Sequence, residues 1–220
     1  MTDSEPTGSR RRPGRGSVPA TYGFLSTYRP SRGGPARFAA ALAAELQTGS
    51  PACRVGVVRV VDRVERSTRP EVVHHLVTTE PGGEAEAAGI LNRFDAVIVQ
   101  HDYAIYGGPD GDQVISVLAR LTVPVIVVLH AVLPDPTPHQ REVLEQVLAA
   151  ADAIVATSPS ARERLLQRYR VDARRVVTIP GTVDATARGD SEPAVPAILG
   201  PIVAQEYRVL AGSLVEEYVA

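Results

Sequence analysis

The sequence predicts an α/β fold built on one doubly wound parallel sheet. Short apolar runs alternate with longer segments of helical periodicity along most of the chain. Two of these runs, 96–99 and 125–129, are continuously apolar, as strands buried on both faces are. The length of 220 residues suits one α/β domain, so we expect a single core.

Seven apolar runs are expected to form the strands of this sheet. They span 20–26, 53–61, 72–77, 96–100, 123–129, 153–157 and 176–179. Four connecting segments repeat apolar residues at spacings of three and four, which predicts helices in the crossovers. These helices span 35–46, 114–121, 139–150 and 160–169.

The two ends of the chain differ from its centre. Residues 1–18 are rich in Gly, Pro, Ser and Arg and have little to bury, so we expect a disordered basic tail. Residues 19–184 are expected to form the α/β domain, and 185–196 have the composition of a linker. Residues 197–220 carry an apolar stripe on one helical face, which predicts a last helix that packs back on the domain.

Composition excludes several classes of function. A formal net charge of −2 gives no basic field that favours nucleic acid. No apolar run is long enough to span a bilayer, and no apolar segment of a signal peptide follows the N-terminal arginines. The single cysteine, Cys53, excludes an internal disulfide, and we expect a cytoplasmic protein.

Four arginines, Arg10, Arg11, Arg12 and Arg15, make the tail locally basic. A solvated extension without a binding role is the simpler interpretation, because four arginines attract a charged surface weakly at physiological salt. Weak contact with an anionic membrane surface is the alternative.

Ligands of doubly wound sheets bind beyond the carboxyl ends of the strands, so the loops after the strands hold the candidate site residues. The loop after the first strand contains Arg29, Arg32, Gly33 and Gly34 and leads into a helix, whose free N–H groups favour an anion. Glycines also serve ordinary tight turns, so both interpretations stay open.

The loop after the fourth strand combines His101, Tyr103 and Tyr106 with glycines, a mixture that suits a sugar or polyol. The alternative is that the two tyrosines merely cover the edge of the sheet. Asp110 is expected to cap the helix that follows this loop.

His130 ends a strongly apolar strand and is a candidate general acid or base. A structural, hydrogen-bonded histidine is the alternative, but the position at the end of a strand favours function. Ser158 is expected first as the N-cap of the next helix and second as a ligand contact. No metal-binding pattern is visible, because the neighbouring His74 and His75 point to opposite faces of a strand.

Five motifs, in their order and spacing, resemble the N-terminal, acceptor-side domain of family 4 retaining glycosyltransferases. They read TYRPSRGGPARF, QHDYAIYGGPDG, VIVVLHAVLPDPTPHQR, IVATSPSARERL and VVTIPGTVD. The resemblance covers about residues 20–184 and implies a Rossmann-like domain that is one half of a GT-B fold. The last helix is similar to the helix that crosses back onto this domain in GT-B enzymes.

The resemblance implies a retaining, hexosyltransferase-like activity that moves a sugar from a UDP- or GDP-linked donor to an unknown acceptor, with no further cofactor and no metal. It places Gly33 and Gly34 near the phosphates of the donor, with Arg29 and Arg32 as charge partners. It places His130 at the reaction centre.

The acceptor side of the site is expected to include His101, Tyr103, Tyr106 and Ser158. Family members also have a second Rossmann-like domain with a glutamate pair that binds the nucleotide sugar, and this sequence shows no such domain. The expected function therefore needs a donor domain from a partner chain. The alternative is a non-catalytic module, derived from a glycosyltransferase, that binds an acceptor or a partner.

Overall fold

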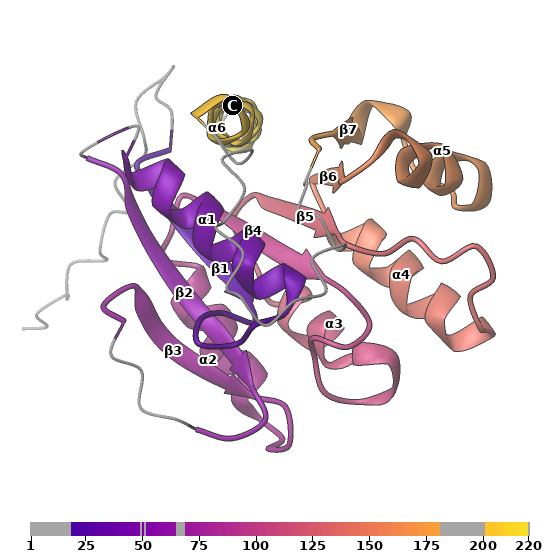
Figure 1. Cartoon of the computed structure of the whole chain (residues 1–220), viewed down its shortest axis with the longest axis horizontal. Helices are drawn as coiled ribbons and strands as arrows, with labels where there is room; N and C mark the ends of the chain where they lie inside the picture. Colours follow the sequence, from indigo (N-terminus) through magenta and orange to yellow (C-terminus); the bar gives the residue numbers. More distant parts are fainter. Residues whose placement is uncertain (1–18, 49, 51, 65–68, 181–200, 220) are drawn as a thin grey trace, which may run out of the picture.

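The computed structural model describes residues 19–48, 50, 52–64, 69–180 and 201–219 (Figure 1). Within these residues, seven parallel strands form one sheet in the order β3-β2-β1-β4-β5-β6-β7. The strands are β1 (Thr21–Ser26), β2 (Arg54–Val61), β3 (Val72–Val77), β4 (Ala96–His101), β5 (Val125–Leu129), β6 (Ala153–Ala156) and β7 (Val176–Thr178). The predicted doubly wound parallel sheet is confirmed.

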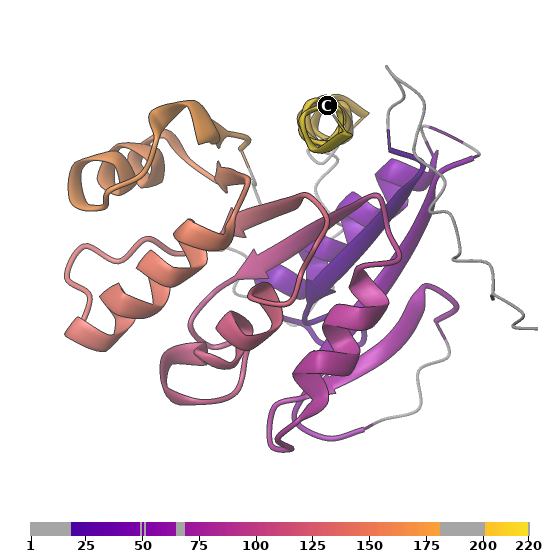
Figure 2. The ribbon, with the colours of Figure 1, turned by 180° about the vertical axis from the view of Figure 1, so that it is seen from behind.

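Helices cover both faces of the sheet, as Figures 1 and 2 show from opposite sides. The helices are α1 (Gly34–Thr48), α2 (Gly83–Leu91), α3 (Gln113–Leu118), α4 (Pro138–Ala150), α5 (Pro159–Arg168) and α6 (Pro201–Val219), with short 3-10 turns η1 (Pro109–Gly111) and η2 (Ala173–Arg175). Helices α1 and α6 share one hydrophobic core with the sheet, and α2, α3, α4 and α5 share the other.

The side chains of each strand alternate between the two hydrophobic cores. In β4, Val97 and Val99 belong to the core under α2 and α3, whereas Ala96 and Ile98 belong to the core under α1 and α6. Successive side chains of a strand point to opposite faces, so a strand covered on both sides must be apolar throughout. For this reason the continuously apolar runs of the sequence form the central strands of the sheet.

Two glycines in the strands make room for one aromatic ring. Gly23 of β1 and Gly56 of β2 are partners in register. A Cβ atom added at Gly56 would lie 2.2 Å from Cζ of Phe94, and one at Gly23 would lie 2.9 Å from Cδ2 of the same ring. The ring of Phe94 therefore packs directly on the backbone of the sheet, which a side chain at either position would prevent.

The order of the strands reverses between β1 and β4. The chain proceeds from β1 outward to β3, returns to lay β4 on the other side of β1, and then continues outward to β7. In such sheets the carboxyl ends of the two strands at the reversal flank the crevice where ligands bind. The loops after β1 and β4 are therefore the segments that position a site.

Helix α6 packs against α1 on one face of the sheet (Figure 1). Arg208 is 8% exposed, and its Nη2 donates hydrogen bonds to the carbonyl oxygens of Glu45 and Leu46, at 2.9 and 2.8 Å. These carbonyls belong to the last turn of α1, where carbonyl groups lack helical partners. The Tyr207 ring meets the Phe38 ring of α1 edge-on, with centroids 6.4 Å apart.

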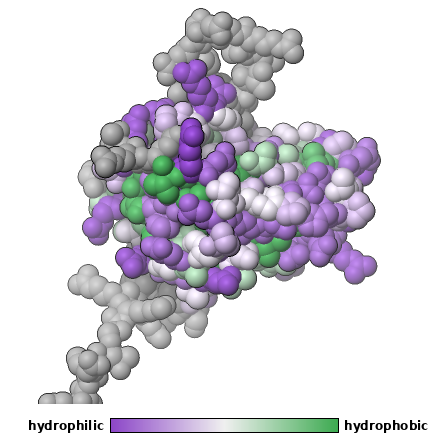
Figure 3. All heavy atoms as spheres, turned by 90° about the horizontal axis from the view of Figure 1, so that it is seen from below, coloured by the Kyte–Doolittle hydropathy of each residue, from purple (hydrophilic) through white to green (hydrophobic). Residues whose placement is uncertain are grey.

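None of the helices in the described part of the chain is long and apolar enough to cross a membrane. Seen from below in Figure 3, the surface is mostly hydrophilic, with separate apolar patches. The predicted tail, 1–18, and the predicted linker, 185–196, lie outside the residues that the structure describes. The four arginines of the predicted tail are therefore outside the described residues as well.

Candidate functional site

Three buried polar side chains lie at the carboxyl ends of β1 and β4, on the two sides of the strand reversal. Ser26 ends β1, and Gln100 and His101 end β4; none of the three is more than 1% exposed. The Oγ of Ser26, the Nε2 of Gln100 and the Nδ1 of His101 have no hydrogen-bond partner. Buried polar groups without partners cost free energy, so this end of the sheet holds unmet hydrogen-bonding capacity.

His130 follows β5 directly and leans over this group. Its backbone N–H donates to the carbonyl of His101 at 3.0 Å, and its Nε2 donates to Oε1 of Gln100. The ring meets Phe38 of α1 edge-on, with centroids 5.4 Å apart. Because Nε2 is the donor, the neutral ring keeps its lone pair on Nδ1.

Burial keeps both histidines of the site uncharged. It lowers the pKa of His130 to about 4, and the nearby carboxylate of Asp102 opposes this effect. Burial also lowers the pKa of His101 to about 4, where Asp102 opposes and His130 adds to the effect. At neutral pH the two imidazoles therefore act as hydrogen-bonding groups or as a base, and not as cations.

The two tyrosines of the loop after β4 differ in their contacts. Tyr106 is 5% exposed, and its hydroxyl makes hydrogen bonds to the carbonyls of Gln100, at 2.7 Å, and Leu25, at 3.3 Å. It thus bridges β4 and β1 at the reversal, with its hydroxyl occupied. Tyr103 meets the His101 ring edge-on, with centroids 5.2 Å apart, and its hydroxyl donates to the carbonyl of Gln140.

The expectation that Asp110 caps α3 is wrong. Asp110 has a φ of 51°, and its carboxylate accepts hydrogen bonds from Nδ1 of His139, at 2.9 Å, and Nε2 of Gln140, at 3.0 Å. Both partners lie in the first turn of α4. The N-cap position of α3 is Asp112, which makes no capping bond with its side chain. Asp110 lies within the 3-10 turn η1, before α3, and its carboxylate ties this turn to α4.

The glycines before α1 leave an open approach to the helix. A Cβ atom added at Gly34 would meet no atom within 4 Å, and one at Gly33 would meet only Cδ of Pro35 at 3.9 Å. Neither residue is among the positive-φ glycines of the described chain. Neither packing nor a positive φ requires glycine at these two positions, and no Cβ atom covers the start of α1 there. Arg29 is partly buried and Arg32 is exposed on the same loop.

Ser158 has the first of its two expected roles. Its Oγ accepts a hydrogen bond from the backbone N–H of Ala161 at 3.1 Å, so it is the N-cap of α5, as predicted. It follows β6, next to β5 and His130 in the sheet. No cluster of three or more His, Cys, Asp or Glu in the described part of the chain is suited to hold a metal ion.

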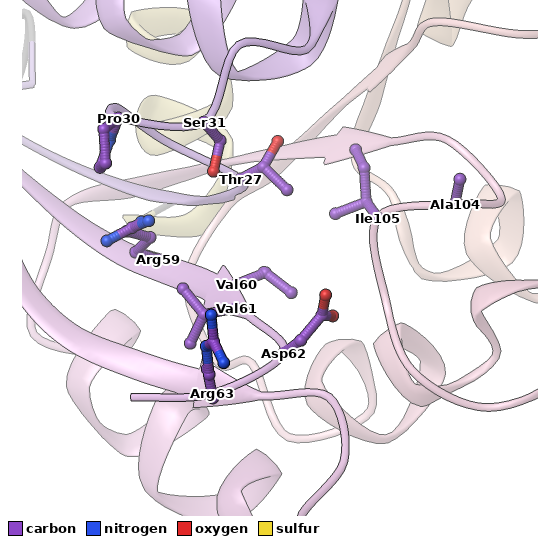
Figure 4. Close-up of a pocket in the computed structure, with 10 residues that line it drawn as sticks. All are labelled: Thr27, Pro30, Ser31, Arg59, Val60, Val61, Asp62, Arg63, Ala104 and Ile105. Carbon is purple, nitrogen blue, oxygen red and sulfur yellow. The ribbon is translucent and has the colours of Figure 1, made fainter. Parts of the chain in front are cut away.

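A cavity of about 650 Å³ lies beside these residues and contains none of them (Figure 4). Its lining comes from the loop after β1, the end of β2 and the loop after β4: Thr27, Pro30, Ser31, Arg59, Val60, Val61, Asp62, Arg63, Ala104 and Ile105. The sequence analysis missed the contribution of β2. The signal was present, since Arg59 is a charged residue within an otherwise apolar run of the strand.

A comparison with protein families identifies the chain. The model of glycosyltransferase family 4 matches residues 32–187. The chain belongs to this family. The resemblance to the N-terminal domain of family 4 enzymes is confirmed, and the predicted Rossmann-like sheet with a last helix packed on it is observed.

Two solved structures are similar to this family 4 chain. HepE from Anabaena, in complex with UDP and glucose, has a TM-score of 0.46 and 13% identity over 74% of this chain and 44% of its own. A glycosyltransferase from Rickettsia africae has a TM-score of 0.46 and 15% identity over 73% of this chain and 42% of its own. This chain thus spans less than half the length of either. No curated protein sequence matches.

Proposed function

We propose that this family 4 domain is the acceptor side of a glycosyltransferase that moves a sugar from a UDP- or GDP-linked donor to an acceptor. A donor-binding domain, in the same protein or in a partner chain, completes the site. The observation that carries the proposal is the neutral cluster of Gln100, His101 and His130 at the strand reversal, with polar atoms that have no partner.

His130 is proposed to contact the sugar that is transferred. Its lone pair on Nδ1 accepts a hydrogen bond from a sugar hydroxyl, while Nε2 stays bound to Gln100. Transfer breaks the bond between the anomeric carbon and the donor phosphate oxygen and forms a bond from that carbon to the acceptor oxygen, while the proton of the acceptor hydroxyl passes to the departing phosphate. A neutral ring suits this position, because a cation would oppose the positive charge that develops on the sugar.

The start of α1 is proposed to hold the departing nucleotide diphosphate. Its free N–H groups, reached past Gly33 and Gly34, stabilise negative charge, and Arg29 and Arg32 add positive charge on the same loop. The acceptor is proposed to lie against His101, Tyr103 and Ser158, with Tyr106 as a buried support of this wall. The alternative role of Gly33 and Gly34, an ordinary tight turn, is not supported by a packing contact.

Calorimetric titration of the chain with UDP-glucose and GDP-mannose tests the donor contact. A valine at Gly34 would cover the start of α1, so we expect Gly34→Val to weaken binding by about tenfold or more. Gly89→Val is the matched control, since a Cβ there also meets no atom within 4 Å but lies on α2.

Equal binding by both variants would contradict the proposed role of the glycine loop. Absence of binding to any nucleotide sugar would favour the second function considered for the sequence, a non-catalytic acceptor module.

A further inference from the structure

Arg59 is an exceptional residue in the sheet. It lies in β2 among valines, is 3% exposed, and has Ser26 of β1 and His75 of β3 as its partners in register. A guanidinium stays charged at any pH the protein meets, and burial of a charge is costly unless other groups compensate it. A valine at this position would continue the apolar pattern of the strand without a charge to bury, so the arginine is not required by the strand pattern itself.

The cavity beside Arg59 has the size and lining of a small-molecule site. Its volume of about 650 Å³ lies within the range of sites for compounds of sugar or sugar-phosphate size. Figure 4 shows Arg59 and Arg63 on the β2 side, across from the loop that carries Thr27 and Ser31. Two cations thus face two hydroxyl groups across one space.

The charge of the lining favours an anion. Among the residues that line the cavity, Arg59 and Arg63 are basic and Asp62 is acidic, and Oδ1 of Asp62 accepts a hydrogen bond from Oγ1 of Thr78 at 2.9 Å. The planar fork of arginine matches the oxygens of phosphate and carboxylate groups. Ser26, next to Arg59 in the sheet, has a buried Oγ without a hydrogen-bond partner, which adds a further polar atom beside the cavity.

We propose that this cavity binds an oxyanion, a phosphate or a carboxylate group, that is carried by the acceptor. Arg59 and Arg63 neutralise the anion, and the hydroxyls of Thr27 and Ser31 donate to its oxygens. The loop after β4 links this cavity to the proposed reaction centre, because Ala104 and Ile105 line the cavity and His101, the last residue of β4, directly precedes the loop. That the anion belongs to the acceptor rests on the proposed function; that the cavity binds an anion does not.

Calorimetric titration of the whole chain, without nucleotide, tests the proposal with four probes: glucose 6-phosphate, glucuronate, glucose and UDP. We expect at least one of the two anionic sugars to bind about tenfold or more tighter than glucose. Which of the two binds distinguishes phosphate from carboxylate. UDP should not compete with the anionic sugar.

Substitutions distinguish a loss of anion binding in the cavity from a loss of folding. Arg63 is exposed, so Arg63→Gln should fold and lose about tenfold in affinity for the anionic sugar. The control is Arg120→Gln, because Arg120 is also exposed but follows α3 and does not line the cavity. Arg59→Lys keeps the buried charge, removes the fork and should also weaken binding.

Equal affinity for glucose and both anionic sugars, or unchanged affinity in Arg63→Gln, would overturn the proposal. Competition by UDP would assign the cavity to the donor phosphates and would overturn the acceptor assignment. Anion binding by a chain that binds no nucleotide sugar would favour the non-catalytic module over glycosyl transfer and would still support the anion site in the cavity.

Discussion

His130 depends on its neighbour for its chemistry. The hydrogen bond to Gln100 sets which ring nitrogen carries the proton, and burial keeps the ring neutral. The histidine and its partner come from the ends of adjacent strands, β5 and β4, so the geometry of the sheet itself holds the pair. A side chain fixed in this way needs little reorganisation when a substrate arrives.

Substitution of His130 tests its place at the reaction centre. We expect His130→Asn to lower the rate of sugar transfer by about 100-fold or more in an assay that supplies a donor-binding domain. The asparagine amide keeps a donor toward Gln100 but presents no imidazole lone pair. Thermal unfolding of the variant serves as the control for folding, and wild-type rates at an unchanged melting temperature would contradict the role.

The pH dependence of stability follows from His101. Its pKa is lowered from 6.5 to about 4 by burial, so the folded chain resists a proton that the unfolded chain accepts. The contribution of neutral His101 to the free energy of unfolding is fully present above about pH 6.5. It falls as the pH drops toward 4, by roughly 3 kcal/mol for a shift of this size. Denaturant unfolding at pH 7 and pH 5 measures this loss, and His101→Phe, which cannot titrate, should show a smaller loss.

Single residues were predictable where one pattern decided their role. Ser158 was recognised as an N-cap because it precedes a helical pattern directly. Asp110 was misassigned because its partners, His139 and Gln140, come from a helix about 30 residues later. Arg59 was missed because a lone charge in a strand gains meaning only when the neighbouring loops form a cavity around it.

Helix α4 begins with a capping box that also anchors the candidate site. Thr137 accepts from the backbone N–H of Gln140, and Oε1 of Gln140 accepts from the backbone N–H of Thr137. The same glutamine donates through Nε2 to Asp110, in the loop after β4. One side chain therefore stabilises the start of a helix and the position of a loop that carries site residues.

Removal of the Thr137 side chain should destabilise the protein by about the contribution of one helix cap. We expect Thr137→Ala to lower the free energy of unfolding by about 1 kcal/mol. Ser213→Ala, at an exposed position in α6, is the matched control and should stay near the wild-type value. Chemical denaturation of the two variants gives both values; an equal effect would show that the cap contributes nothing specific.

The strands were predicted to within a few residues because buried parallel strands are continuously apolar. Five helices were predicted and one, α2, was missed, since Gly83–Leu91 is built largely from alanine, glycine and glutamate and shows little apolar periodicity. The strand order and its reversal between β1 and β4 cannot be deduced from local sequence patterns. They follow from how the whole chain packs, so the cavity between three loops was beyond sequence reasoning.

The molecule has two cores, and α6 completes the one that lies under α1. Tyr207 is fully buried there, whereas Val209, two residues later, is 58% exposed. We expect Tyr207→Ala to lower the free energy of unfolding by about 3–5 kcal/mol and Val209→Ala to change it by about 0.5 kcal/mol or less. Similar effects of the two substitutions in denaturant unfolding would mean that α6 adds little to the core.

The bonds from Arg208 to the end of α1 join positions as many as 163 residues apart in the sequence. Side chains, and not the covalent path, seat the last helix against α1. The entropy of closing a flexible connection rises by only about 0.6 kcal/mol for each doubling of its length. Lengthening the stretch between Pro180 and Pro201, even by a whole domain, therefore costs little free energy while the bonds from Arg208 hold α6 against α1.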